Sequence, residues 1–266
     1  MRYGLIAGNG RFPLLALETA RGLGHDVTVV AIQEEASPEV ERLAERCHWI
    51  SLGALSKLID ILKQDGITEV VMCGQVKHAK IFSSIRPDWR LAKLLMSLPS
   101  KNTDGLIGGV IKVLADEGIR LTDSTALLKP LLAVDGAMTR RKPEKDEWTD
   151  IEYGRRVANA LSGFDVGQSV AICERACVAL EAMEGTDAML RRAAGLVNGR
   201  RLTLVKAARR REHLLFDVPV VGRDTIPVMR ETGTTVLAVE AGRTLMLDRE
   251  EMLEAANAAG ISIVGI

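Results

Sequence analysis

Residues 4–13, GLIAGNGRFP, decide the fold class of this chain. The apolar stretch that ends at Ala7 predicts a short buried strand, and Gly8 stops it. Pro13 then stands in the first turn of an expected helix, a position that proline tolerates because its missing N–H would be unpaired there. Strand, glycine turn and helix in this order predict the first unit of a parallel α/β sheet. The dinucleotide pattern GxGxxG would need glycine where Pro13 stands, so the pattern for a nicotinamide cofactor is incomplete.

Strand-like and helix-like segments keep alternating through the first third of the chain. Further strands are expected at 27–32, 49–52 and 70–73, and helices at 12–23, 38–46 and 54–64. Residues 87–134 are expected to be mainly helical, with 118–121 as a candidate strand. Alternation of this kind implies a parallel sheet with right-handed crossovers, so a Rossmann-like N-terminal domain is expected.

A second α/β domain is expected in the C-terminal half, where strands and helices alternate again. Between the halves, TRRKPEKDE at 139–147 is polar and contains Pro143, which is typical of a solvated connection. The predicted organisation is therefore a Rossmann-like domain at 1–135, a linker at 136–147 and a distinct catalytic α/β domain at 148–266.

Composition narrows the class of protein. Lys+Arg and Asp+Glu are both 35 and aromatic residues make up 3%, which argues against a strongly basic or base-stacking nucleic-acid binder. The four cysteines lack metal-ligand spacing and are expected to be free thiols in a reducing compartment. No signal peptide and no apolar stretch of about 20 residues is present, so a cytoplasmic protein is expected, which would meet a membrane only from its surface.

Two glycine turns are candidate phosphate contacts. Gly8, Asn9 and Gly10 would let the backbone approach a ligand at the start of a helix, although a tight turn alone also explains them. Gly74 and Lys77 follow the strand at 70–73, and ligands of open parallel sheets lie beyond the carboxyl ends of strands. A lone surface lysine is the alternative for Lys77.

An acidic turn at 181–190, EAMEGTDAML, is the most unusual stretch. Thr186 or Asp187 would cap the helix that follows, and this explains both residues structurally. Glu181, Glu184 and Asp187 nevertheless place three carboxylates within seven residues. Such density suits a hard cation such as Mg²⁺, which takes oxygen ligands and bridges phosphates.

A basic stretch, KAARRREHLLFDVPVVGRDT at 206–225, is the natural complement of that turn. Lys206 and Arg209 belong to a cluster of cations, and guanidinium groups match phosphate geometry. Asp217 lies among apolar neighbours, where a carboxylate is either buried with a partner or functional. Asp104, in NTDG at 102–105, would cap the next helix and is also a candidate site carboxylate.

The chain resembles the LpxI-type UDP-2,3-diacylglucosamine diphosphatases of lipid A biosynthesis in collinear order over nearly its whole length. The resemblance rests on GLIAGNGRFP at 4–13, DIEYG at 150–154, DVGQ at 165–168, EAMEGTDAML at 181–190, FDVPVVG at 216–222 and VEAG at 239–242. EGTDAML is the most specific of these motifs. One departure stands at 209–215, where the family pattern Lys-Pro-x-Gln-Asp-x-Arg is replaced, which puts those roles in doubt.

This resemblance implies a lipid nucleotide held between two domains and Mg²⁺-dependent hydrolysis to UMP and 2,3-diacylglucosamine 1-phosphate. The implied catalytic residues are Asp217, Asp187 and Thr186, and the expected Mg²⁺ ligands are Asp217, Asp187 and Glu184. The expected substrate contacts are Gly8, Asn9, Gly10, Gly74, Lys77, Asp104, Lys206 and Arg209.

Several alternatives stay open from the sequence. A non-catalytic protein of the same fold that binds a nucleotide or lipid nucleotide is the main rival, and the altered stretch at 209–215 would then mark lost catalysis. Leucines at 91–98, together with Met96, belong either to the core or to a cover for acyl chains. Peripheral contact with the inner membrane and a homodimer also stay open.

Overall fold

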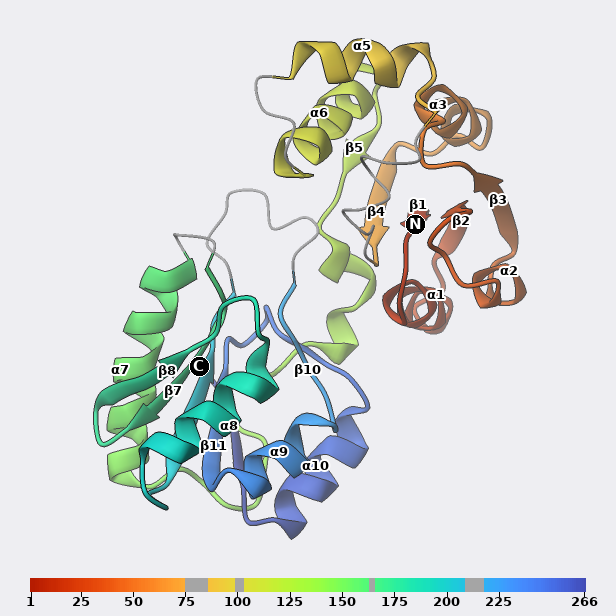
Figure 1. Cartoon of the computed structure of the whole chain (residues 1–266). Coiled ribbons are helices and arrows are strands. Elements are labelled where there is room, and N and C mark those ends of the chain that lie inside the picture. The colour runs from red at the N-terminus through yellow and green to blue at the C-terminus, as the bar shows by residue number, and fades with distance from the viewer. Residues whose placement is uncertain (75–85, 99–102, 163–165, 209–217) are drawn as a thin grey trace. The chain divides into compact units, whose positions relative to one another are not determined.

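The computed structural model describes residues 1–74, 86–98, 103–162, 166–208 and 218–266, and Figure 1 labels their helices and strands. The chain divides into two compact units, Met1–Leu128 and Lys129–Ile266. Each unit has its own sheet, in agreement with the expectation of two α/β domains.

The first unit is built on a five-stranded sheet in the order β3-β2-β1-β4-β5. Every neighbouring pair is parallel, which confirms the predicted parallel sheet. The order reverses between β1 and β4, so the carboxyl ends of these two strands flank the switch point, where ligands of such sheets bind. The strands are β1 (Arg2–Ala7), β2 (Asp26–Ile32), β3 (Arg46–Ile50), β4 (Glu69–Cys73) and β5 (Arg120–Leu121).

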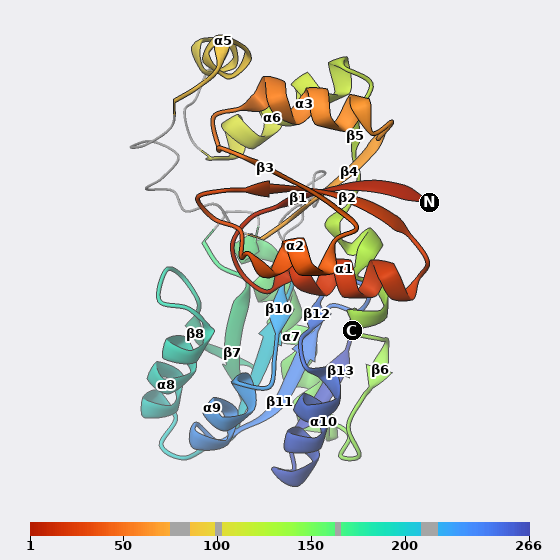
Figure 2. The ribbon, with the colours of Figure 1, turned by 90° about the vertical axis from the view of Figure 1, so that its right-hand side faces the viewer.

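Helices cover both faces of this sheet, and the strands are therefore apolar on both sides. Figure 2 shows α1 and α2 along one face and α3 and α6 along the other. The helices are α1 (Phe12–Gly22), α2 (Glu39–Leu43), α3 (Leu55–Gln64), α5 (Trp89–Ser97) and α6 (Thr103–Asp116), and a 3-10 turn, η1 (Ser124–Leu127), ends the unit.

Asp88 ties the starts of α3 and α5 together. Its carboxylate accepts hydrogen bonds from the Leu91 amide at 2.9 Å and the Ser56 amide at 2.6 Å. Burial opposes ionisation of this carboxyl, but hydrogen bonds from Leu91 and Ser56 outweigh it and lower its pKa. The N-terminus of α5 is thus fixed to the body of the unit.

The second unit has a six-stranded mixed sheet in the order β6-β13-β11-β9-β7-β8. Strands β9, β11 and β13 run parallel to one another, whereas β7 is antiparallel to both of its neighbours. A separate parallel pair is formed by β10 and β12. The strands are β6 (Gly136–Ala137), β7 (Ser169–Cys173), β8 (Ala176–Leu180), β9 (Leu202–Lys206), β10 (Val220–Val221), β11 (Thr234–Val239), β12 (Leu245–Met246) and β13 (Ser262–Gly265).

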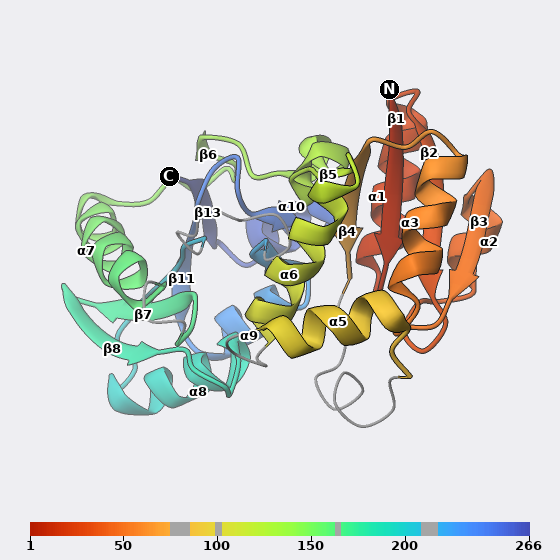
Figure 3. The ribbon, with the colours of Figure 1, turned by 90° about the horizontal axis from the view of Figure 1, so that it is seen from above.

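Helices lie on both faces of this sheet as well. Met189, Met229 and Met252 come from α8, α9 and α10 and belong to the buried cluster on one face. Ile151 and Ala158 of α7 belong to the cluster on the other face, and Figure 3 shows α7 and α8 on opposite sides of β7 and β8. The helices are α7 (Lys145–Ser162), α8 (Thr186–Leu196), α9 (Thr225–Glu231) and α10 (Arg249–Ala258), and the 3-10 turn η2 (Lys129–Leu131) begins the unit.

The boundary between the units lies after Leu128, earlier than the predicted linker at 136–147. That stretch belongs to the second unit, because β6 pairs with β13 and α7 begins at Lys145. Its charged composition suggested a solvated connection, but Arg141 and Glu147 of this stretch pair with each other and bond to residues far along the chain. Strands β6 and β8 were not predicted either; both are short edge strands of the sheet.

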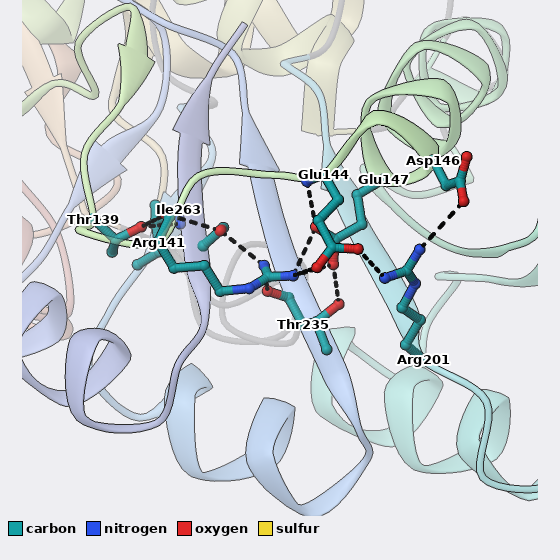
Figure 4. A network of polar contacts seen from close by, with 9 residues as sticks. Thr139, Arg141, Glu144, Asp146, Glu147, Arg201, Thr235 and Ile263 are labelled. Atoms are coloured by element: carbon teal, nitrogen blue, oxygen red, sulfur yellow. Dashed lines mark hydrogen bonds and ion pairs between the residues drawn. The ribbon is translucent and has the colours of Figure 1, made fainter.

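The half-buried Arg141 and the buried Glu147 form an ion pair within the stretch that was predicted to be a linker (Figure 4). Glu147 is 0% exposed, and one Arg141 nitrogen donates to both of its carboxylate oxygens at 2.7 and 2.8 Å. Thr235 and the Glu144 amide complete its hydrogen bonds. Burial opposes ionisation, but hydrogen bonds led by the one from Arg141 lower the pKa of the Glu147 carboxyl.

All four cysteines, Cys47, Cys73, Cys173 and Cys177, are free, in agreement with the expectation of unpaired thiols. Burial raises the pKa of the Cys73 thiol to about 12, so this thiol is inert at neutral pH. Among the helices of the described residues, none combines the length and the apolar character that crossing a bilayer requires.

Candidate functional site

The carboxyl edge of the parallel strands in the second unit collects most of the described candidate side chains. Lys206 ends β9 and pairs with Ser169, the first residue of antiparallel β7. Leu180 ends β8 beside Val170, so Glu181 follows at the same edge. Open α/β sheets bind ligands beyond this edge. The strand directions therefore bring together residues that are far apart in the sequence.

The hydroxyl of Thr186 is the hub of this cluster. It donates to Glu181 Oε1 at 2.9 Å, and Ser169 Oγ lies 3.2 Å away. Lys206 Nζ donates to the same oxygen at 3.5 Å. A hydroxyl has one proton and two acceptor lone pairs, so Thr186 uses its full capacity here. The Thr186 hydroxyl oxygen consequently contacts both the Glu181 carboxylate and the Lys206 ammonium group.

Close backbone packing sets the position of Glu181. Gly167 lies so near that a Cβ built on it would meet the Glu181 carbonyl oxygen at 2.0 Å, which leaves room only for glycine. The Glu181 amide in turn donates to the Ser169 carbonyl at 2.9 Å. The chain on either side of the hub is therefore held from two directions.

The start of α8 differs from the prediction in one respect. Gly185, with φ of +83°, occupies the N-cap position, and no side chain caps the helix there. Thr186 and Asp187 instead form its first turn, and the Thr186 hydroxyl is thereby directed to Glu181 rather than to a helix amide. The positive φ explains why glycine precedes Thr186.

The three carboxylates of the acidic turn do not converge. Glu184 forms an ion pair with Arg192 at 2.6 Å and accepts a hydrogen bond from the Ala182 amide. Hydrogen bonds from its own amide, from Arg192 and from Ala182 lower the pKa of the Glu184 carboxyl. Asp187 is exposed. Within the part of the chain that the structure describes, no three His, Cys, Asp or Glu side chains are grouped to hold a metal ion.

Glu240 also lies at this edge, although it was not among the predicted site residues. It follows β11, and its carboxylate accepts from the Ala208 amide at 2.9 Å while Arg243 lies 3.5 Å away. Glu240 thus anchors the chain just after β9, beside Lys206. Its motif, VEAG at 239–242, carries part of the resemblance to the LpxI family, and this was the only indication in the sequence of a place for Glu240 in the site.

The two glycine turns of the first unit meet at its switch point. Gly8 donates from its amide to the Cys73 carbonyl at 2.8 Å. Gly74 has φ of +94°, and a Cβ on it would meet the Asn9 carbonyl oxygen at 2.5 Å. Gly10, with φ of +97°, is exposed, and nothing lies within 4 Å of where its Cβ would be. Two loops therefore pack against each other beyond the carboxyl ends of β1 and β4: Gly8 and Asn9 belong to one, and Gly74 to the other.

Three predicted site residues, Lys77, Arg209 and Asp217, lie outside the described residues, as does the side chain of Asp104. Their roles stay predictions. An open apolar hollow on α7 is lined by Tyr153, Arg156, Val157, Ala160 and Leu161. None of these is a predicted site residue.

Comparison with known families identifies both units. The model of the LpxI N-terminal domain matches residues 2–131, and that of the LpxI C-terminal domain matches residues 134–264. The chain belongs to the LpxI family. It is 30% identical over 275 aligned residues to the UDP-2,3-diacylglucosamine pyrophosphatase LpxI of Caulobacter vibrioides, and the match covers 100% of this chain and 97% of that protein.

Similarity to solved structures is weak by comparison. UDP-glucose 4-epimerase from Stenotrophomonas maltophila has a TM-score of 0.31 at 17% identity and covers 45% of this chain and 34% of its own. N5-carboxyaminoimidazole synthetase from Staphylococcus aureus has a TM-score of 0.29 at 13% identity and covers 64% and 32%. Similarity at this level identifies neither the fold nor the activity.

One stretch that carries the resemblance to the LpxI family, DIEYG at 150–154, has a structural role. The buried Asp150 carboxylate accepts from the Arg175 amide at 2.6 Å, in a hairpin turn where Glu174 and Arg175 both have positive φ. Gly154 lets α7 approach the sheet, because a Cβ there would meet Val205 at 2.6 Å. This motif stabilises the hairpin of β7 and β8 and the packing of α7 against the sheet.

Proposed function

We propose that this chain hydrolyses the pyrophosphate bond of UDP-2,3-diacylglucosamine to UMP and 2,3-diacylglucosamine 1-phosphate in lipid A biosynthesis. The observation that supports this most is the full-length match to the Caulobacter vibrioides pyrophosphatase together with both LpxI domain models. The cluster around Thr186 supports it chemically, because it combines a cation, a carboxylate and two hydroxyls at the ligand-binding edge of a sheet.

Lys206 is the described cation best placed for a phosphate role in this proposal. Its ammonium group lies 3.5 Å from the Thr186 hydroxyl, which also bonds Glu181. A lysine held in place in this way stabilises the charge that develops on phosphate oxygens when water attacks phosphorus. The Thr186 hydroxyl would position both the ammonium group and the Glu181 carboxylate, because it contacts each of them. Asp217 remains the predicted carboxylate that orients the water or holds the metal.

Mg²⁺ dependence is the part of the proposal that the described residues support least. Glu184 is already paired with Arg192, and the described carboxylates make no three-ligand group. Because Mg²⁺ is usually held by one or two carboxylates together with substrate phosphates, Asp187 with Asp217 would be a sufficient protein contribution. Removal of the metal by a chelator tests this directly.

We further propose that one substrate molecule contacts residues of both units. In the first unit, the packed loops that contain Gly8, Asn9 and Gly74 offer backbone groups at the switch point, where open sheets bind nucleotides. In the second unit, the cluster around Thr186 offers side chains. Substitutions in either unit should then raise the KM or lower the kcat for the same substrate.

The decisive experiment is incubation of the purified protein with UDP-2,3-diacylglucosamine and Mg²⁺, with and without EDTA. We expect release of UMP that EDTA abolishes, and a run in ¹⁸O-water should place the label on the product of the attacked phosphorus. Asp217→Ala should abolish UMP release without loss of the fold. Tight binding of the substrate without UMP release would contradict hydrolysis and establish a binding protein instead.

A further inference from the structure

The outer face of α5 carries apolar side chains that the fold leaves exposed. Trp89 is 66% exposed and Met96 is 81% exposed. With Lys93 between them, they have the spacing i, i+4 and i+7, which places all three side chains on one face of the helix. Trp89 is considerably more exposed than Trp148, the other exposed tryptophan, at 39%.

The opposite face of α5 is packed firmly, so the exposure of its outer face does not come from a loose helix. Leu91 and Leu94 are buried. Gly109 of α6 lies so close that a Cβ on it would meet Leu94 at 2.6 Å and Leu98 at 3.0 Å. Asp88 caps the helix and ties it to Ser56. The rotation of α5 is therefore fixed by packing and capping.

The charge of α5 is positive on the side that faces solvent. The helix contains Arg90 and Lys93 and no carboxylate. Arg90 is neutralised by Glu117 at 2.6 Å, and its guanidinium lies 5.2 Å from the Trp89 ring centroid. Among the described residues, Lys93 has no carboxylate partner. The outer face thus pairs an indole and a thioether with an uncompensated ammonium group.

We propose that the outer face of α5 docks on an anionic lipid bilayer, with Trp89 and Met96 in the interfacial layer and Lys93 against headgroup phosphates. Tryptophan favours this layer because its ring is apolar and its N–H is polar, and a lysine stem lets the ammonium reach the headgroups. The choice of partner rests on the proposed function, since two acyl chains would keep the substrate in a membrane. Apolar and cationic side chains on one short helix are the chemistry of surface-bound helices.

The test compares two double variants in vesicle sedimentation. Trp89→Ser with Met96→Ser removes the proposed contact, and Leu23→Ser with Leu196→Ser removes two exposed apolar side chains elsewhere. We expect the first variant to bind phosphatidylglycerol-containing vesicles about tenfold more weakly than the wild type, and the second to bind equally well. Lys93→Glu should weaken binding to these vesicles and leave residual binding to phosphatidylcholine vesicles unchanged. Circular dichroism should show that all variants are folded.

Equal vesicle binding by the Trp89/Met96 variant and the wild type would overturn the proposal. So would concentration-dependent self-association that this variant alone loses in sedimentation equilibrium, because the face would then be a contact between copies of the chain. Hydrolysis of detergent-dispersed substrate separates the two proposals. Hydrolysis without vesicle binding overturns only the membrane inference, and vesicle binding without hydrolysis overturns only the proposed function.

Discussion

The two edges of the six-stranded sheet carry polar clusters of opposite character. At the amino edge of β9, β11 and β13, Glu147 is fully buried and receives hydrogen bonds from Arg141, Thr235 and the Glu144 amide. At the carboxyl edge, Thr186, Glu181 and Lys206 are only half-buried. The central carboxylate of the first cluster is closed to solvent, although its partner Arg141 is 28% exposed, whereas all three charged or polar groups of the second are partly open to solvent.

From this difference we infer a structural role for the first cluster and propose a functional role for the second. Buried polar groups that satisfy one another fix the fold and offer nothing to a ligand. A half-buried cluster in which one hydroxyl contacts both a carboxylate and an ammonium group is partly exposed to solvent, so a substrate can reach it. Loss of a group at the amino edge should therefore cost stability, whereas loss at the carboxyl edge should cost activity.

The largest expected effect is the loss of stability in Glu147→Ala. Removal of this carboxylate leaves the half-buried Arg141 guanidinium with only a longer ion pair, to Glu144 at 3.7 Å, so the unfolding free energy should fall by about 3 kcal/mol, the lower end for a broken buried pair. Urea denaturation measures this. Glu144→Ala is the matched control, because the Glu144 side chain is 62% exposed and its ion pairs with Arg201 and, at 3.7 Å, with Arg141 should together contribute less than about 1 kcal/mol. Equal losses in both variants would remove the distinction between the edges.

Lys206→Ala should show the reverse behaviour. We expect kcat/KM for UDP-2,3-diacylglucosamine to fall about 100-fold or more, because a cation that stabilises charge in the transition state is lost. The unfolding free energy should change by less than about 1 kcal/mol, since Lys206 is only half-buried at the end of its strand. A large loss of stability with unchanged turnover would show that the carboxyl edge is structural as well.

Much of the fold could be predicted from local pattern. The apolar runs that became β1, β2 and β4 lie between glycine-marked turns, and buried parallel strands have this composition. The linker prediction went wrong because local composition does not reveal distant partners. Arg141 donates to Ser262, which is 121 residues away, and Glu147 accepts from Thr235, which is 88 residues away.

Some residues of the candidate site could likewise be predicted from local sequence, and others could not. Thr186 stood out because its motif is unusual, and Lys206 because cations cluster after it. Ser169 gave no such signal, since its place beside Thr186 depends on the antiparallel pairing of β7 with β9. The prediction that Thr186 or Asp187 caps α8 was wrong. Both are residue types that commonly cap helices, and only the backbone geometry shows that Gly185 occupies the N-cap position.

Gly167→Ala tests whether the open edge depends on its backbone geometry. A Cβ at this position would meet the Glu181 carbonyl oxygen at 2.0 Å, so the chain at 181 must shift and move the partner of Thr186. We expect kcat/KM to fall about tenfold and the unfolding free energy to fall by about 2 kcal/mol. Gly195→Ala in α8 is the control, because nothing lies within 4 Å of its Cβ and alanine favours helix. Full activity in Gly167→Ala would show that Glu181 need not be held.

The smallest expected effect concerns acid sensitivity of the closed edge. The pKa of the Glu147 carboxyl in the folded state lies below the ordinary 4.5, because hydrogen bonds from Arg141, Thr235 and Glu144 outweigh burial. A depressed pKa contributes stability that is complete above the ordinary value and disappears as pH falls through the folded one. The stability gap between wild type and Glu147→Gln should therefore narrow by about 1 kcal/mol between about pH 6 and about pH 3. Glu231→Gln, which alters an exposed pair with Arg191, should show a nearly constant gap. If the Glu147→Gln gap were equally constant, the carboxylate charge would not stabilise the amino edge, and the contrast between the edges would rest on hydrogen-bond geometry alone.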